Sequence, residues 1–107
     1  MKRFAQVIRI KPERFEEYRA AHADVWPEVL DMIRQCNIRN YSIFHYNNLL
    51  FAYFEYVGDD FEADMARMGA HLKTQEWWDW MKPMQEPVPE CTEGEWWHTI
   101  EEVFHTD

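Results

Sequence analysis

The sequence predicts an α+β protein of the ferredoxin-like, split βαβ type, in which helices cover one face of a four-stranded antiparallel sheet. Several runs of β-branched and aromatic residues read as strands, and other segments carry apolar residues at helical spacing. Their order is strand, helix, strand, strand, helix, strand, which is the order of that fold. At this length, and without repeats or linkers, residues 1–107 should form a single domain.

The first strand and the first helix lie at the N-terminus. Phe4–Ile10 is rich in β-branched and aromatic residues, as strands are. Pro12 suits the first turn of a helix, and the glutamates that follow match the positive end of the helix dipole. One side of this helix should carry Phe15, Tyr18 and His22, which are spaced at i, i+3 and i+7.

A proline interrupts this helix. Pro27 pushes the preceding residue, Trp26, out of the helical region, and Asp24 is available to cap a second helical piece. The apolar stripe of that piece should contain Trp26, Val29, Leu30 and Ile33.

The middle of the chain predicts a β-hairpin. Ile38–Tyr46 and Leu49–Val57 are both rich in tyrosine, isoleucine and phenylalanine, and they are joined through Asn47 and Asn48. Asparagine tolerates the backbone conformation that a two-residue hairpin turn requires. These two strands should therefore pair with each other.

Two short helices and a last strand complete the pattern. The segment 61–81 has helical composition, with Gly69 as the break between two helices. Prolines at 83, 87 and 89 end the second helix and make the segment up to residue 95 a loop of tight turns. The final strand is expected at Trp97–His105.

The composition of the chain limits the kinds of molecule that the protein is expected to bind. A net charge of −9, with lysine and arginine scattered, disfavours nucleic acid and acidic membranes, so a small neutral molecule is the expected ligand. No signal peptide is recognisable and no apolar run is long enough to span a membrane, so the cytoplasm is the expected compartment, where Cys36 and Cys91 should be reduced thiols. The remaining apolar face of the sheet predicts a homodimer.

The sharpest candidate for chemistry is His22, because histidine exchanges protons near neutral pH. Tyr18, His22 and Trp26 follow at four-residue spacing, which would flank the imidazole with aromatic rings. On spacing alone, each of these residues, and Tyr41, can equally be part of an ordinary helix or core face.

The adjacent indoles of Trp77 and Trp78 point in different directions on a helix, so one of them should face a cavity. Flat indole faces with an N–H donor suit a sugar ring. The second pair, Trp96 and Trp97, is expected to pack in the loop. No standard zinc, nucleotide or nucleophile motif occurs, so no metal site is predicted.

The chain resembles the L-rhamnose mutarotase family in five motifs spread over nearly its full length: EEYRAAHADVWPE at 16–28, NYSI at 40–43, NLLFA at 48–52, WWDWM at 77–81 and EEVFH at 101–105. The resemblance implies a dimeric α/β barrel of ferredoxin-like subunits that uses no cofactor. It also implies that His22 is the catalytic acid and that the sugar contacts are Tyr18, Tyr41, Trp77 and Trp78.

The implied reaction is interconversion of the α and β anomers of a 6-deoxyhexose by ring opening and reclosure. His22 would protonate the ring oxygen, while Tyr18, Tyr41 or a water takes the proton of the anomeric hydroxyl. After Met84 the chain departs from the family, with QEPVPECTEGEWW in place of an asparagine-proline-aspartate-asparagine type of loop. L-Fucose is therefore the alternative to L-rhamnose. Two other classes stay open: a non-catalytic sugar-binding module, and a haem or aromatic-oxidation protein with His22 as axial ligand.

Overall fold

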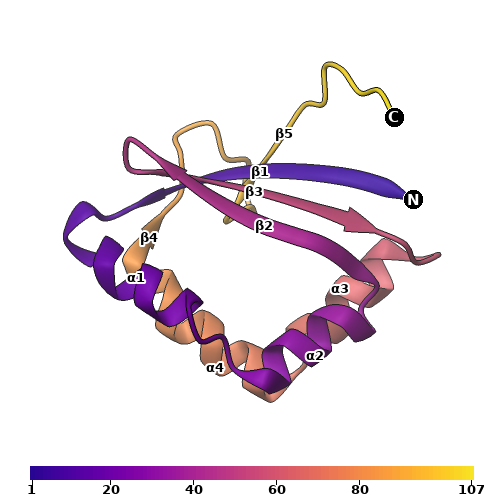
Figure 1. The fold of residues 1–107 in the computed structure, drawn as a ribbon, viewed down its shortest axis with the longest axis horizontal. Coiled ribbons are helices and arrows are strands. Elements are labelled where there is room, and N and C mark those ends of the chain that lie inside the picture. The colour runs from indigo at the N-terminus through magenta and orange to yellow at the C-terminus, as the bar shows by residue number, and fades with distance from the viewer.

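A curled antiparallel sheet and four helices on one of its faces make up the computed structural model, which describes residues 1–107 (Figure 1). The strands are β1 Lys2–Ile10, β2 Ile38–Tyr46, β3 Leu49–Tyr56, β4 Gln85–Glu86 and β5 His98–Ile100. The helices are α1 Phe15–His22, α2 Pro27–Gln35, α3 Phe61–Gly69 and α4 Leu72–Met81, with 3-10 turns at Pro12–Arg14 and Lys82–Met84. No helix combines the length and apolar character needed to cross a membrane.

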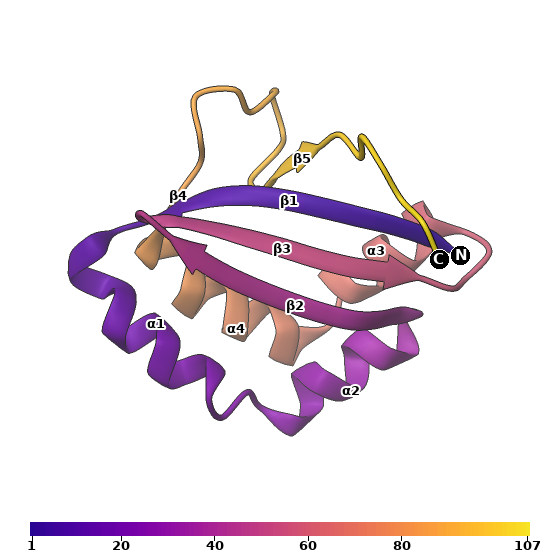
Figure 2. The same cartoon turned by 45° about the horizontal axis from the view of Figure 1, so that its top comes forward.

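The strand order is β2-β3-β1-β4, and every pairing is antiparallel, which confirms the ferredoxin-like prediction. The fourth position of the sheet is divided between two short strands on the free edge of β1. β4 pairs with Arg9 and Ile10, and β5 pairs with Ala5–Val7. The loop between them extends beyond this edge of the sheet (Figure 2).

Two predictions for this edge were wrong. The last strand covers only His98–Ile100 rather than 97–105, and residues 101–107 are exposed without regular structure. The adjacent glutamates at 101 and 102 offer no apolar face to bury, which explains the early end of the strand. β4 lies inside the segment that was predicted to be a loop. It is two residues long because Pro87 has no N–H to continue the ladder.

The helices begin and end largely where proline and glycine predict. Trp26 has extended backbone angles, φ −58° and ψ 132°, as a residue before proline should. Trp26 itself is the N-cap of α2, so the prediction of Asp24 as the cap was wrong: Pro27 fixes the first helical position. Leu30 is 52 % exposed because α2 turns Val29 and Met32 toward the core instead.

The hairpin of β2 and β3 is confirmed. Asn47 and Asn48 both have positive φ, 52° and 62°, the signature of the type I′ turn that matches the twist of paired strands. Leu50, Ala52 and Phe54 of β3 alternate inward toward the helices. The main core lies between the sheet and the helices and contains Ile8, Ile10, Leu50, Val29, Met81 and Met84. Both cysteines are free thiols, as predicted.

Candidate active site

Tyr18 and His22 lie one above the other on α1, because residues four apart share a helix face. Their ring centroids are 4.2 Å apart with an interplanar angle of 30°. His22 Nδ1 lies 2.8 Å from the carbonyl oxygen of Tyr18. A carbonyl can only accept, so Nδ1 carries the proton. In the neutral ring, Nε2 is then left as a hydrogen-bond and proton acceptor.

Burial lowers the pKa of His22 below its ordinary value, and the hydrogen bond to the Tyr18 carbonyl opposes this shift only in part. The ring is half-buried, so it keeps some access from outside. Near neutral pH the imidazole is therefore mainly neutral, with its acceptor nitrogen available for an incoming hydroxyl group.

Tyr18 is a buried residue. The residue is 4 % exposed, and burial is the main cause that raises the pKa of its phenol, with a smaller effect of the Tyr41 phenol in the same direction. Gln85 Nε2 donates a hydrogen bond to this hydroxyl at 3.1 Å. Tyr18 is thus a neutral phenol throughout the physiological range, and its oxygen already accepts one bond from the protein.

Trp77 completes the group that the structure brings together. It is 5 % exposed, and its ring meets His22 edge-on at 5.3 Å and 74°. Trp26 packs against the same indole at 5.3 Å and 77°. Because α1 ends at His22, Trp26 lies beyond the helix, and its ring contacts that of Trp77. It is a packing residue rather than a second wall beside the imidazole.

Trp78 points elsewhere, as the divergence of adjacent helical residues predicts. It is half-buried, and the Lys82 ammonium lies 5.9 Å from the centre of its ring. The same ammonium lies 5.7 Å from the ring of Trp96 in the loop between β4 and β5. The sugar contact expected at Trp78 stays a prediction, since no contact joins its ring to Tyr18 or His22.

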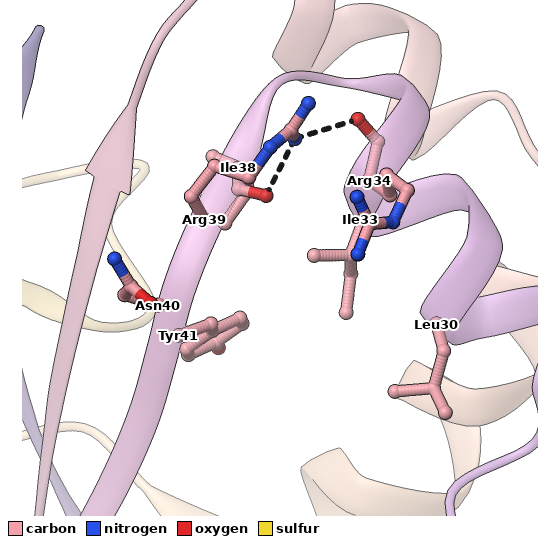
Figure 3. Close-up of a pocket in the computed structure, with 7 residues that line it drawn as sticks. All are labelled: Leu30, Ile33, Arg34, Ile38, Arg39, Asn40 and Tyr41. Atoms are coloured by element: carbon pink, nitrogen blue, oxygen red, sulfur yellow. Dashed lines mark hydrogen bonds between the residues drawn. The ribbon is translucent and has the colours of Figure 1, made fainter.

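Tyr41 reaches the space between β2 and α2. Burial of its hydroxyl end raises its pKa to about 12, although 43 % of the residue is exposed. Figure 3 shows its ring projecting from β2 toward Leu30 on α2, across a pocket of about 250 Å³. The remaining lining residues are Ile33, Arg34, Ile38, Arg39 and Asn40. Arg39 is held there by bonds to the carbonyl oxygens of Arg34 and Ile38, at 3.0 and 2.9 Å.

Sequence reasoning missed two polar contacts of this site. Gln85 was predicted to lie in a loop of tight turns, yet it is only 7 % exposed and bonds to Tyr18. Trp96 was expected to pack in the loop, and both it and Trp97 do pack against the main core. In addition, Trp96 Nε1 donates to Gln85 Oε1 at 2.7 Å. No local sequence pattern predicts either contact, because each depends on how distant parts of the chain pack together.

One group of side chains has the chemistry of metal ligands. Donor atoms of Cys91, Glu95 and His98 all lie within 4.8 Å of one another. Glu95 already accepts bonds from His98 Nδ1 at 2.9 Å and from the backbone N–H groups of Thr92 and Thr99. These bonds, that of His98 foremost, lower the pKa of Glu95 to about 2. In this arrangement the carboxylate ties the loop together.

Comparison with known proteins gives the chain its family. The sequence profile described as L-rhamnose mutarotase matches residues 3–106. The chain belongs to the L-rhamnose mutarotase family. It is 35 % identical to the L-rhamnose mutarotase of Phocaeicola vulgatus and 31 % identical to that of Oceanobacillus iheyensis, in each case over 100 % of both chains.

Solved structures agree with this membership at the level of the fold. The crystal structure of an L-rhamnose mutarotase from Formosa agariphila has a TM-score of 0.77 and 23 % identity, with 100 % of both chains covered. The polyketide cyclase tetracenomycin F2 cyclase, from Streptomyces glaucescens, has a TM-score of 0.70 and 20 % identity, with 99 % of this chain and 96 % of that chain covered. The fold is thus shared with a protein outside the mutarotase family, so the residues of the site have to carry the functional argument.

Proposed function

We propose that this chain is an aldose mutarotase that interconverts the α and β anomers of L-rhamnose. The observation that carries the proposal is the Tyr18–His22 pair, in which the backbone fixes the imidazole tautomer and a neutral phenol stacks beside it. The relatives that match the chain over its whole length are named L-rhamnose mutarotase, which supports L-rhamnose over L-fucose as the substrate.

The chemistry follows from the state of His22. Neutral Nε2 takes the proton of the anomeric hydroxyl, the bond between C1 and the ring oxygen breaks, and C1 becomes an aldehyde. The imidazolium then gives this proton to the ring oxygen, which is also bonded to C1 and therefore within reach of the same ring. Rotation about C1–C2 and the reverse steps close the ring as the other anomer. His22 is thus the acid at the ring oxygen, as the family resemblance implies, after first acting as a base.

The aromatic residues hold the sugar in this scheme. The Tyr18 hydroxyl donates to a sugar oxygen next to the imidazole, and Tyr41 does so from the pocket side. Trp77 limits the motion of the His22 ring by its edge-on contact. Enclosure by these rings strengthens each hydrogen bond relative to water, and no covalent intermediate is required.

We also propose that two copies of the chain associate through the sheet face away from the helices. Phe44 pairs with Phe51 across β2 and β3, and Phe51 alternates with the inward Leu50 and Ala52, so both phenylalanines face outward. Phe44 is 64 % exposed and Tyr46 is 74 % exposed. A second copy would cover this aromatic surface. Sedimentation equilibrium tests the association, and a monomer at micromolar concentration would exclude it.

The cytoplasm remains the proposed place of action. Both cysteines are unpaired thiols, which suits a reducing compartment. Fractionation of the native cells, with the protein detected in the soluble fraction of the cell interior, is the corresponding test.

The function itself is tested by saturation-transfer NMR, which measures exchange between the two anomeric protons of a free sugar. Wild-type protein should accelerate exchange of L-rhamnose well above the uncatalysed rate, and more than that of L-fucose or of either D-enantiomer. Faster exchange of L-fucose would reassign the substrate, and the altered loop at 85–97 would be the region to examine. Saturable sugar binding without faster exchange would show a binding module instead.

A further inference from the structure

We infer that Gln85 and Trp96 are positioning residues that set the direction of the hydrogen bond at Tyr18, so that the phenol proton points to the sugar. This inference rests on the proposed function and deepens it. It concerns two side chains that do not touch the imidazole. They act on the reaction only through the Tyr18 hydroxyl.

The direction of each bond follows from the chemistry of the donors. An indole nitrogen can only donate, so the 2.7 Å contact of Trp96 Nε1 must end on the oxygen of the Gln85 amide. The amide nitrogen of Gln85 then faces Tyr18, 3.1 Å from its hydroxyl. An amide NH₂ can only donate as well, and so the Tyr18 oxygen accepts. The phenol proton is left over for another acceptor.

No protein acceptor takes up that proton. The bond from Gln85 is the one hydrogen bond that the Tyr18 hydroxyl makes with the protein. A sugar offers ring, anomeric and hydroxyl oxygens, all of which accept. The chain from Trp96 to Gln85 to Tyr18 therefore selects an oxygen acceptor beside His22 and rejects a ligand that offers only donors there.

The elements around the two residues hold them in place. Gln85 is 7 % exposed and belongs to β4, where it pairs with Ile10 of β1. The ring of Trp96 lies beneath the Lys82 ammonium at 5.7 Å, and its carbonyl oxygen accepts from the Cys91 thiol at 3.5 Å. The preceding residue, Glu95, anchors the loop by its bonds to backbone and to His98. The loop thus fixes a hydroxyl that belongs to α1, 67 residues away from Gln85 along the chain.

The decisive variants are Gln85→Glu and Gln85→Leu. A carboxylate in place of the amide accepts from both sides, so the Tyr18 proton turns toward residue 85 and away from the sugar. Leucine removes the donor but leaves the proton free. We expect exchange of L-rhamnose at pH 8 to fall in Gln85→Glu by about tenfold or more and in Gln85→Leu by less. A purely structural role predicts the opposite order, because glutamate preserves the shape of glutamine and leucine does not.

The pH dependence gives a second readout. In Gln85→Glu, protonation of the new carboxyl restores an O–H that can donate to Tyr18, so part of the lost rate should return as the pH is lowered toward neutrality. Wild type and Gln85→Leu should show no such recovery. Trp96→Phe removes the indole donor, lets the amide turn over and should slow exchange severalfold, whereas Trp97→Phe, in the same loop, should not.

The outcomes separate the inference from the proposed function. Variants are compared only where thermal melts show them folded, and Trp96→Phe carries the test if the buried glutamate prevents folding. An active wild type together with full activity at pH 8 in Gln85→Glu and in Trp96→Phe would overturn the inference alone. So would a folded Gln85→Leu that is slower than Gln85→Glu. A wild-type chain that exchanges no sugar would overturn the proposed function, and the inference with it.

Discussion

α1 and α3 lie toward opposite ends of the sheet (Figure 1). Each end has one buried tyrosine, Tyr18 or Tyr56, and the two hydroxyls differ in how much of their hydrogen-bonding capacity the protein uses. At the α3 end, the Tyr56 hydroxyl donates to Asp64 at 2.5 Å and accepts from the backbone N–H of Asp60 at 3.0 Å. At the α1 end, the Tyr18 hydroxyl only accepts, from Gln85. One phenol is saturated by the protein, and the other keeps its proton available.

The residues around the two tyrosines show the same difference in unused hydrogen-bonding capacity. The Tyr56 ring meets Phe61 edge-on at 5.1 Å, and Phe61 in turn stacks on Phe4 and Phe54. The hydrogen bond from Tyr56 lowers the pKa of Asp64, whose carboxylate also accepts from Asn37. Tyr18 stands against an imidazole that lacks a partner on its acceptor nitrogen. Burial alone therefore does not mark a functional tyrosine in this fold. The unfilled hydrogen-bonding capacity does.

The largest effect should come from removing the imidazole beside Tyr18. His22→Ala should slow L-rhamnose exchange by about 10² to 10⁴-fold, the usual contribution of a positioned acid–base group. His105→Ala, which removes an imidazole from the exposed C-terminal segment, is the matched control and should keep the wild-type rate. Equal rates in both variants would take His22 out of the reaction.

Removing the Tyr56 hydroxyl should lower the stability of the protein rather than its activity. Tyr56→Phe leaves Asp64 and the Asp60 N–H each without one partner, so the free energy of unfolding should fall by about 1–3 kcal/mol. Urea denaturation measures this change. The exchange rate per folded molecule should equal that of wild type, and a parallel loss of rate would remove the distinction between the two ends.

A crowded glycine offers a milder version of this test. A Cβ added to Gly58 would lie 2.5 Å from the Tyr56 hydroxyl oxygen and 2.7 Å from Asn37 Nδ2. Gly58→Ala should lower the free energy of unfolding by about 1 kcal/mol, because the buried Tyr56 ring and the Asn37 amide have to move and their hydrogen bonds weaken. Thermal unfolding checks the value. An unchanged melting temperature would mean that the Tyr56 hydrogen bonds are looser than the geometry implies.

The smallest effect is the pH dependence at the Tyr18 end. Because burial lowers the pKa of His22, its neutral form persists below the ordinary value of 6.5, and catalysed exchange should stay constant from pH 8 to about 6.5. It should then fall by at most about tenfold per pH unit. The raised pKa values of Tyr18 and Tyr41 predict no loss on the alkaline side up to about pH 9. Catalysed rates that rise below pH 6.5 would show that the imidazolium starts the reaction.

Some features of the fold and of the site could be predicted from residues close together in the sequence, and others could not. The hairpin follows from the Asn47-Asn48 turn, and the stacking of Tyr18 on His22 follows from helical spacing. The position of Trp77 against His22 depends on how α4 packs on α1, and periodicity carries no information about that. Gln85 reaches Tyr18 only because β4 pairs with the end of β1. The family resemblance supplied the site residues on the helices and β2, whereas the loop that departs from the family contains the contacts that were missed.

The role of the Tyr18 hydroxyl is tested most directly by measuring L-rhamnose anomer exchange in Tyr18→Phe and Tyr56→Phe side by side, per folded molecule. Tyr18→Phe should lose about ten- to a hundredfold of the catalysed rate because the donor to the sugar is gone, and it should also lose some stability because the buried Gln85 amide loses its acceptor. Tyr56→Phe should lose stability and keep the rate. Equal catalysed rates in the two variants would contradict the claim that the unsaturated hydroxyl of Tyr18 marks the active site.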